Sequence, residues 1–178
     1  MLDFDSLVFL DETGFKASIH RDRGWAPIGE TPTVIAPYRG ENVTAIGAIR
    51  LTGDCGLTLL EGYMNKVDFL RYLRDVLGPS LREGDWVVMD NLRSHTSKEA
   101  HQVLAEFGAK PLFLPPYTPE YNPIEFCWGI MKARFRQLPL VKGVTAVIDR
   151  VAALWKELDV TLFRRCIEHC GYLNLAST

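Results

Sequence analysis

The stretch that decides the fold is DWVVMDNLRSHTSKEAHQVLAEFGAKPLFLP, residues 85–115. Its apolar run DWVVMD predicts a buried strand that ends in Asp90. Thr96 and Glu99 have the spacing of a capping box that begins a helix, and Gly108 ends that helix. The run KPLFLP then predicts a second short buried strand. A strand, a helix and a strand in this order pair in parallel through a helix crossover, so the stretch predicts an α/β fold.

Strands and helices on both sides of this stretch complete the predicted architecture. Before it, three strands in an antiparallel meander are predicted at 7–11, 42–51 and 56–64. A helix follows them from a capping box of Asn65 and Asp68, with apolar positions at Val67, Leu70, Leu73 and Leu77. After the stretch, helices are predicted from Asn122 and near 144–158 and 161–170. This order predicts a mixed five-stranded sheet flanked by helices.

The bulk composition is that of a single soluble domain. The 178 residues are 47% apolar and 24% charged, and no stretch approaches the ~18 uninterrupted apolar residues of a membrane span. No secretory signal precedes the four cysteines, so we expect reduced thiols and a cytoplasmic location. A net charge of −2 and a pI of about 6.1 count mildly against a nucleic-acid binder, although a local basic face can act within a neutral total.

Three acids fall at element boundaries of the predicted sheet. Asp11 ends the first strand, Asp90 ends the fourth, and Glu125 lies in the first turn of the helix after the fifth. Ligands of open α/β sheets gather beyond the carboxyl ends of strands, so these carboxylates are expected to converge. Oxygen ligands without His or Cys partners favour Mg²⁺ or Mn²⁺, and two such ions would suit in-line displacement at phosphorus.

Each acid also has a structural alternative. Asp11 fits a turn at a strand end, and its neighbour Glu12 competes for the site, although strand alternation sends the two to opposite faces. Asp90 fits an Asx turn. Glu125 lies three residues after Asn122, where a capping-box glutamate would lie, and for Glu125 alone the capping role is favoured. The argument for a site is that all three acids fall at element boundaries in one topology.

The helix that begins near Pro123 has two faces with different chemistry. The core face repeats at helical spacing, with Ile124, Trp128, Met131 and Phe135. One position on, the same spacing gives Glu125, Gly129, Lys132 and Arg136. This second face is either a solvated charged surface or a DNA-contacting surface on which Gly129 gives room and the two cations contact phosphates.

Three further residues are candidates for supporting roles. His95 follows Asp90 by five residues and is expected to hydrogen-bond near the acids rather than to bind metal. Asn91 either shapes the metal loop or serves as a turn residue. Arg23, in the loop or hairpin excursion near 23–32, is a candidate DNA contact or a solvated surface residue.

Five motifs together resemble a known family. They are FLDETGF (9–15), RGWAPIGETP (23–32), MDNLRSH (89–95), LFLPPYTPEYNPIEFCWGIMKARFR (112–136) and FRRCIEHCGY (163–172). They resemble the catalytic domain of the insertion-sequence-630 branch of the mariner-type transposases, over nearly the whole chain. The proline-rich block and DNLRSH are the most specific of these motifs.

The resemblance implies a ribonuclease H-like fold and a DDE triad that binds two Mg²⁺ or Mn²⁺ ions. Matched by motif, the triad is Asp11, Asp90 and Glu125, and the 34 residues between the last two agree with the family's spacing. The implied reaction is hydrolysis of a phosphodiester at a transposon end, followed by attack of the freed 3′-hydroxyl on target DNA that usually contains TA. The implied partners are these DNAs and a second copy of the chain in the active complex.

One departure concerns recognition of the transposon ends. Family members carry an N-terminal helix-turn-helix region, whereas this sequence reaches its first catalytic strand within about ten residues. Residues 1–178 are therefore expected to form the catalytic domain alone, as a fragment, a separate reading-frame product or a degenerate copy, with a helix-turn-helix protein as a possible partner. Two other functions stay open: a metal-dependent nuclease without strand transfer, and an inactive remnant that acts as an interaction module.

Overall fold

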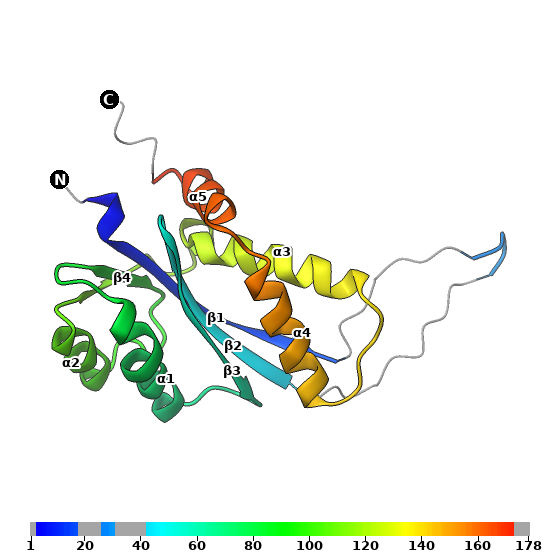
Figure 1. The fold of residues 1–178 in the computed structure, drawn as a ribbon, viewed down its shortest axis with the longest axis horizontal. Coiled ribbons are helices and arrows are strands. Elements are labelled where there is room, and N and C mark those ends of the chain that lie inside the picture. The colour runs from blue at the N-terminus through cyan, green and yellow to red at the C-terminus, as the bar shows by residue number, and fades with distance from the viewer. Residues whose placement is uncertain (1–2, 18–25, 31–41, 173–178) are drawn as a thin grey trace.

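The chain folds as a mixed sheet with helices on both faces. The computed structural model describes residues 3–17, 26–30 and 42–172. In these ranges five strands have the order β3-β2-β1-β4-β5. Helices α1 and α2 cover one face and α3, α4 and α5 the other (Figure 1). The elements are β1 (Leu7–Lys16), β2 (Asn42–Arg50), β3 (Gly53–Glu61), α1 (Lys66–Tyr72), β4 (Trp86–Met89), α2 (Lys98–Glu106), β5 (Lys110–Phe113), α3 (Pro123–Gln137), α4 (Val144–Lys156) and α5 (Val160–His169).

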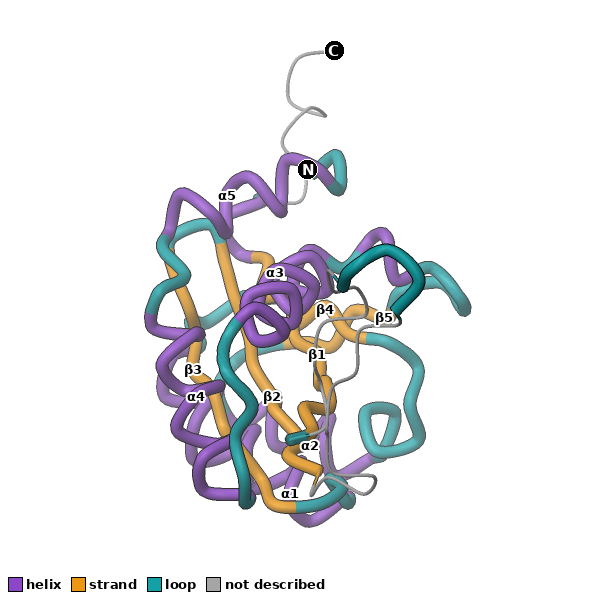
Figure 2. Tube along the Cα trace, turned by 90° about the vertical axis from the view of Figure 1, so that its right-hand side faces the viewer, coloured by secondary structure: helices purple, strands orange, loops and turns teal. Residues whose placement is uncertain are grey.

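The sheet confirms the predicted mixture of pairings. β1, β2 and β3 form the antiparallel meander, and β4 and β5 join β1 in parallel. The parallel pairs are connected through α1 and α2, as the strand–helix–strand order predicts. In Figure 2 the short strands β4 and β5 lie on the side of β1 away from β2 and β3.

β1 is longer than predicted. It runs to Lys16, so the expectation that Asp11 ends the strand is wrong. The parallel ladder with β4 covers only Leu7 to Phe9, whereas the antiparallel ladder with β2 continues to the end of β1. The apolar run therefore marks only the part of β1 that is covered on both sides. Asp11 lies in mid-strand, just past the point where β4 stops.

Alternation along β1 divides its side chains between two cores. Leu7, Phe9 and Phe15 pack in the core under α3, α4 and α5. Val8 and Leu10 pack in the core under α1 and α2. Asp11 therefore faces α3, and Glu12 faces the opposite side, as alternation predicts.

A glycine in β2 lets α3 lie close to the sheet beside Asp11. Gly47 is the direct partner of Asp11 in the β1–β2 ladder. A Cβ atom on Gly47 would lie 2.9 Å from the ring of Trp128 on α3 and 3.0 Å from the ring of Trp155 on α4. The two indole rings lie 5.2 Å apart, centroid to centroid. Any larger residue at position 47 would push these rings, and α3 with them, away from the sheet.

The helix after β3 begins as predicted, but the first of its predicted apolar positions is exposed. Asn65 and Asp68 form the predicted capping box. Of the predicted apolar positions, Leu73 and Leu77 are buried, whereas Val67 is 64% exposed and the unpredicted Phe69 is buried. The helix continues as a π-helical turn at Leu73–Leu77, and this turn breaks the regular α-helical spacing on which the prediction depended.

The cap of α2 lies one residue later than predicted. The Ser97 hydroxyl accepts a hydrogen bond from the Ala100 N–H, whereas the Thr96 hydroxyl donates to the Leu92 carbonyl. The capping box of Thr96 and Glu99 is therefore wrong. Thr96 instead closes the loop that follows β4.

A buried ion pair lies at the end of β2. Arg50 Nη2 is 2.8 Å from Asp85 Oδ2, and both side chains are almost fully buried. Arg50 also donates to the Cys55 sulfur and to the Ser80 carbonyl. These contacts tie β2 to the segment that leads into β4.

Two expectations from composition can be compared with the described residues. None of their helices is long and apolar enough to cross a membrane. The four cysteines at 55, 127, 166 and 170 are free thiols.

Candidate active site

The three predicted acids line one cavity of about 460 Å³. Asp11 comes from the middle of β1, Asp90 directly follows β4, and Glu125 lies in the first turn of α3. The loop between β5 and α3 forms the facing wall, and the full lining is Asp11, Asp90, Asn91, Leu92, Leu114, Pro115, Pro116, Tyr117, Thr118, Pro119, Asn122 and Glu125. Residues more than a hundred positions apart are thus brought together at the carboxyl end of β4.

Asp90 is held by the loop that follows it. Its Oδ1 accepts a hydrogen bond from the Leu92 N–H at 3.0 Å and lies 2.7 Å from Nδ1 of His95. Burial alone would raise the pKa of Asp90, but the contacts with His95 and Leu92 outweigh it and lower the pKa. The Asx-turn alternative is therefore correct as a local description, and it fixes the orientation of a carboxylate that also lines the cavity.

His95 lies between two carboxylates. It is fully buried against the Phe69 ring, and its Nε2 is 3.3 Å from Oε2 of Glu12. Burial would lower the pKa of His95, but Asp90 and Glu12 raise it to about 9, so the imidazole is cationic near neutral pH. These are ion-pair contacts without the linear alignment of strong hydrogen bonds.

Glu12 joins the site through His95, a contact that the sequence does not predict. Alternation correctly places Glu12 on the face opposite Asp11. On that face Glu12 contacts His95, and the other ring nitrogen of His95 contacts Asp90. The spacing of Glu12 and His95 in the chain does not predict this contact, because it forms between β1 and the loop after β4.

Asp11 and Glu125 line the same cavity, and the positive charge around them does not balance their two carboxylates. Burial, followed by the negative charges of Glu125, Glu12 and Asp90, raises the pKa of Asp11 well above its usual value. Its Oδ2 is buried without a hydrogen-bond partner. The pKa of Glu125 is also raised, first by burial, although the Lys132 charge opposes the shift. A bound cation would supply the missing positive charge and lower both pKa values.

The donor set fits a hard divalent cation. An orphaned carboxylate oxygen on Asp11 and two further carboxylates in one cavity are the oxygen ligands that Mg²⁺ and Mn²⁺ prefer. Within the described ranges, no three His, Cys, Asp or Glu side chains form a ready-made metal cluster. Side-chain rotation would be needed for the three acids to hold an ion together.

The capping alternative for Glu125 is wrong. Asn122 occupies the N-cap position of α3, but its side chain makes no capping hydrogen bond. Its backbone N–H donates to the Pro119 carbonyl at 2.9 Å, so it is not the partner of the Glu125 carboxylate in a capping box. The Asn122 amide instead donates to the Leu10 carbonyl at 3.1 Å.

The loops around the cavity are tied to one another. The Asn91 amide donates to the Leu114 carbonyl at 2.6 Å, which joins the loop after β4 to the end of β5. In the proline-rich loop, Tyr117 has φ of 61° and a fully exposed side chain. A positive φ is uncommon for a non-glycine residue, so this loop has a specific rather than a relaxed path.

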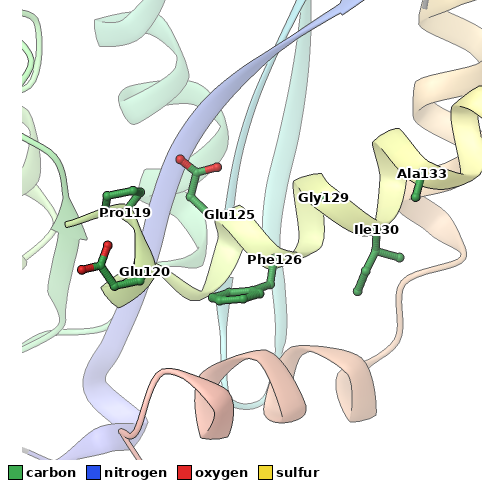
Figure 3. A pocket seen from close by; sticks show the side chains of 7 residues that line it. All are labelled: Pro119, Glu120, Glu125, Phe126, Gly129, Ile130 and Ala133. Atoms are coloured by element: carbon green, nitrogen blue, oxygen red, sulfur yellow. The ribbon is translucent and has the colours of Figure 1, made fainter. Parts of the chain in front are cut away.

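The outer side of α3 carries Glu125 and an open groove. Figure 3 shows Glu125 on one side of the helix and Phe126 and Ile130 on the side toward α5. The groove has a volume of about 570 Å³ and is lined by Pro119, Glu120, Glu125, Phe126, Gly129, Ile130 and Ala133. A Cβ on Gly129 would meet no atom within 4 Å, so this glycine leaves the helix surface open.

The predicted DNA-contacting cations lie farther along α3. Lys132 is half-buried, with its Nζ 5.9 Å from the centre of the Phe15 ring, and Arg136 is exposed. On the core face, Ile124, Trp128, Met131 and Phe135 are buried as predicted. Arg23 lies outside the described residues.

Comparisons with known proteins identify a family by its sequence profile and a fold by solved structures. A profile of the DDE superfamily endonucleases matches residues 6–147. A comparison with curated proteins finds no match. Among solved structures, the Mos1 transposase paired-end complex with left transposon end has a TM-score of 0.77 at 17% identity, over 94% of this chain and 52% of that one. A pre-cleavage Mos1 transpososome has a TM-score of 0.78 at 15% identity, over 97% and 56%.

The catalytic domain of Mos1 mariner transposase, solved alone, has a TM-score of 0.70 at 15% identity and covers 94% of this chain and 80% of that one. The chain thus spans about half the length of the first two Mos1 chains. The predicted ribonuclease H-like mixed sheet is confirmed by these matches and by the sheet order. Because the profile covers most of its length, the chain belongs to the DDE superfamily endonuclease family.

Proposed function

We propose that this chain is a transposase catalytic domain that hydrolyses DNA phosphodiesters and joins the freed 3′ end to target DNA. In this proposal Asp11, Asp90 and Glu125 are the catalytic acids and the metal ligands. The observation that carries it is the meeting of the three acids in one cavity of a DDE-family chain. The unpartnered Oδ2 of Asp11 supports a cation there.

The metal that the family implies is Mg²⁺ or Mn²⁺, and we propose two ions per site. Mos1 structures are described with each of these metals. When bound, such ions supply activation of the attacking oxygen and stabilisation of the leaving oxygen. The acids orient the ions, and His95 holds Asp90 in place while its positive charge balances part of the carboxylate cluster. Asn91 anchors the same loop to β5.

The proposed partners are transposon ends and TA-containing target DNA, with two copies of the chain in the active complex. The Mos1 paired-end complex, described with a left transposon end, supports DNA as a partner. A helix-turn-helix region or protein would supply end recognition. On this chain we assign DNA contacts to the Gly129, Lys132 and Arg136 face of α3, which adjoins Glu125.

The function is tested by a strand-transfer assay. The chain, supplied with Mn²⁺ and a labelled transposon end, is expected to move the labelled 3′ end into plasmid DNA. Cleavage without transfer would instead identify a metal-dependent nuclease. A chain that neither binds Mn²⁺ nor cleaves DNA would be an inactive remnant.

Changing Lys132 and Arg136 together to glutamine is expected to weaken DNA binding and flatten its salt dependence. Each lost phosphate contact lowers the slope of log K against log salt by about 0.9, so the double variant should lose about 2. Fluorescence anisotropy over a salt series measures the slope. Arg134→Gln is the matched control, because Arg134 lies on the same helix but pairs with Glu157 at 3.1 Å. An unchanged slope in the double variant would remove this face from the interface.

Metal affinity is expected to tighten as pH rises. The pKa values of Asp11 and Glu125 are raised in the metal-free protein, so an ion must displace protons from these acids. Raising the pH through these raised pKa values, which lie above the ordinary carboxyl value of about 4, removes those protons and favours binding. Calorimetric titration with Mn²⁺ in buffers of different ionisation enthalpy gives the protons released per ion. Binding that releases no protons and ignores pH would contradict the assignment.

A further inference from the structure

Asn122 holds the start of α3 to the strand that carries Asp11. Its side chain is 3% exposed, and its Nδ2 donates to the Leu10 carbonyl oxygen at 3.1 Å. A carbonyl only accepts hydrogen bonds, so the amide nitrogen must be the atom that faces it. Leu10 is the residue directly before Asp11. One hydrogen bond thus joins the first turn of the catalytic helix to the peptide next to a catalytic acid.

The backbone of Asn122 is fixed toward Glu125 as well. The Glu125 N–H donates to the Asn122 carbonyl at 3.0 Å, and the Asn122 N–H donates to Pro119 at 2.9 Å. Asn122 therefore contacts Asp11's strand through its side chain and Glu125's turn through its main chain. Asn122 is thus a direct hydrogen-bonded link between the two acids, in addition to the packing of α3 on the sheet at Gly47.

The contact lies where β4 no longer pairs with β1, although β2 still does on the other side. The β1–β4 ladder ends at the pair Phe9–Val88, and Leu10 is one residue farther along β1. The Asn122 amide meets β1 at this point, beside the cavity that it lines with Asp11 and Glu125. Asn122 thus stabilises the stretch of β1 that extends past β4.

Helix capping does not explain this residue. Asn at an N-cap normally accepts a hydrogen bond from the first turn, as Asn65 does from Val67 and Asp68 at the start of α1. Asn122 makes no such bond, and its Oδ1 is buried without a partner. An unpartnered buried oxygen lowers stability, so stability alone does not account for an asparagine here.

We propose that Asn122 is a positioning residue that sets the separation of Asp11 and Glu125, and through it the affinity for the divalent metal. This inference rests on the proposed function, in which these two acids bind the metal. In this proposal Asn122 acts through its neighbours and is not itself a metal ligand. Its effect is transmitted through the Leu10 peptide on one side and the first turn of α3 on the other.

The test uses serine, which caps helices about as well as asparagine but is too short to carry an amide donor to Leu10. Asn122→Ser and Asn122→Ala are compared with Asn65→Ser and Asn65→Ala, the same changes at a helix start where the side chain does cap. For each protein the Mn²⁺ dissociation constant is measured from the electron paramagnetic resonance signal of free Mn²⁺. The melting temperature is measured without metal.

At position 122, serine and alanine are expected to weaken Mn²⁺ binding alike, by about 10- to 100-fold, as loss of a partner that orients metal ligands typically does. At position 65, neither change should alter Mn²⁺ affinity, and serine should melt higher than alanine. Wild-type Mn²⁺ affinity in a folded Asn122→Ser protein would overturn the inference. Absence of Mn²⁺ binding by the wild type would instead overturn the proposed function on which it rests.

If the variants at 122 do not fold, the wild type decides. The side-chain amide protons of Asn122 are expected to exchange slowly with solvent and to shift in the nuclear magnetic resonance spectrum on addition of Mg²⁺. Those of Asn65, which is exposed and lies outside the cavity that the acids line, should exchange fast and show no shift. Fast exchange and no Mg²⁺ response at Asn122 would overturn the inference.

Discussion

The Asp90→Asn variant is expected to lose both strand cleavage and strand joining while it keeps its fold. The amide has the shape of the carboxylate and can still accept a hydrogen bond from the Leu92 N–H. It lacks the charge that the proposed metal site requires. The loss should exceed the about 10- to 100-fold that follows removal of an outer partner of a metal ligand. A labelled transposon end with Mn²⁺ measures both steps.

A matched acid on the surface controls for the loss of one charge. Asp149 on α4 is exposed and lies outside the cavity, so Asp149→Asn should cleave and join as the wild type does. Circular dichroism and thermal melting should show both variants folded. Cleavage at the wild-type rate by Asp90→Asn would reject the metal assignment.

The largest expected loss of stability follows from Asp85→Ala. Arg50 is 4% exposed in the native structure, so this change leaves its guanidinium buried without a carboxylate partner. Removing one partner of a buried ion pair typically costs about 3–5 kcal/mol, a large share of the about 5–15 kcal/mol that stabilises a domain. Urea denaturation followed by tryptophan fluorescence measures the free energy of unfolding.

Two further variants identify the cause of that loss. Arg50→Met combined with Asp85→Leu replaces both charges by apolar groups and should recover most of the stability. Glu157→Ala breaks the exposed pair with Arg134 and should change stability far less, since solvent screens exposed pairs. If Asp85→Ala destabilised no more than Glu157→Ala, the buried pair would not hold β2 to the start of β4.

Residues 85–115 allow the fold class to be predicted because their signals are local. An apolar run, a cap and a stop glycine determine each element without reference to the rest of the chain. The length of β1 could not be predicted in this way. Thr13 and Phe15 continue the strand because β2 pairs with them, and the apolar run alone does not reveal that partner.

Local sequence signals likewise determine which site residues could be predicted. The boundary positions of Asp90 and Glu125 follow from the local pattern. The same pattern places Asp11 at a boundary too, which is wrong, and only the motif resemblance identifies it independently of that position. Glu12 on β1 meets His95 in the loop after β4, so their spacing in the chain carries no signal. Asn122 was predicted to cap α3 because Asn before Pro usually does, and its tertiary contact with Leu10 overrides that preference.

The hydrogen bond between Asn122 and Leu10 joins residues 112 positions apart, which has a consequence for biosynthesis. During translation, β1, β2 and β3 emerge early and can pair with one another as neighbours. The third acid is made only after residue 124, and α3 then has to dock beside Asp11. Polypeptides terminated or cleaved before residue 122 carry two of the three acids and lack the Asn122–Leu10 hydrogen bond. If the three acids act as proposed, incomplete translation products would be unable to nick DNA, and the activity would arise only in chains that have folded through α3.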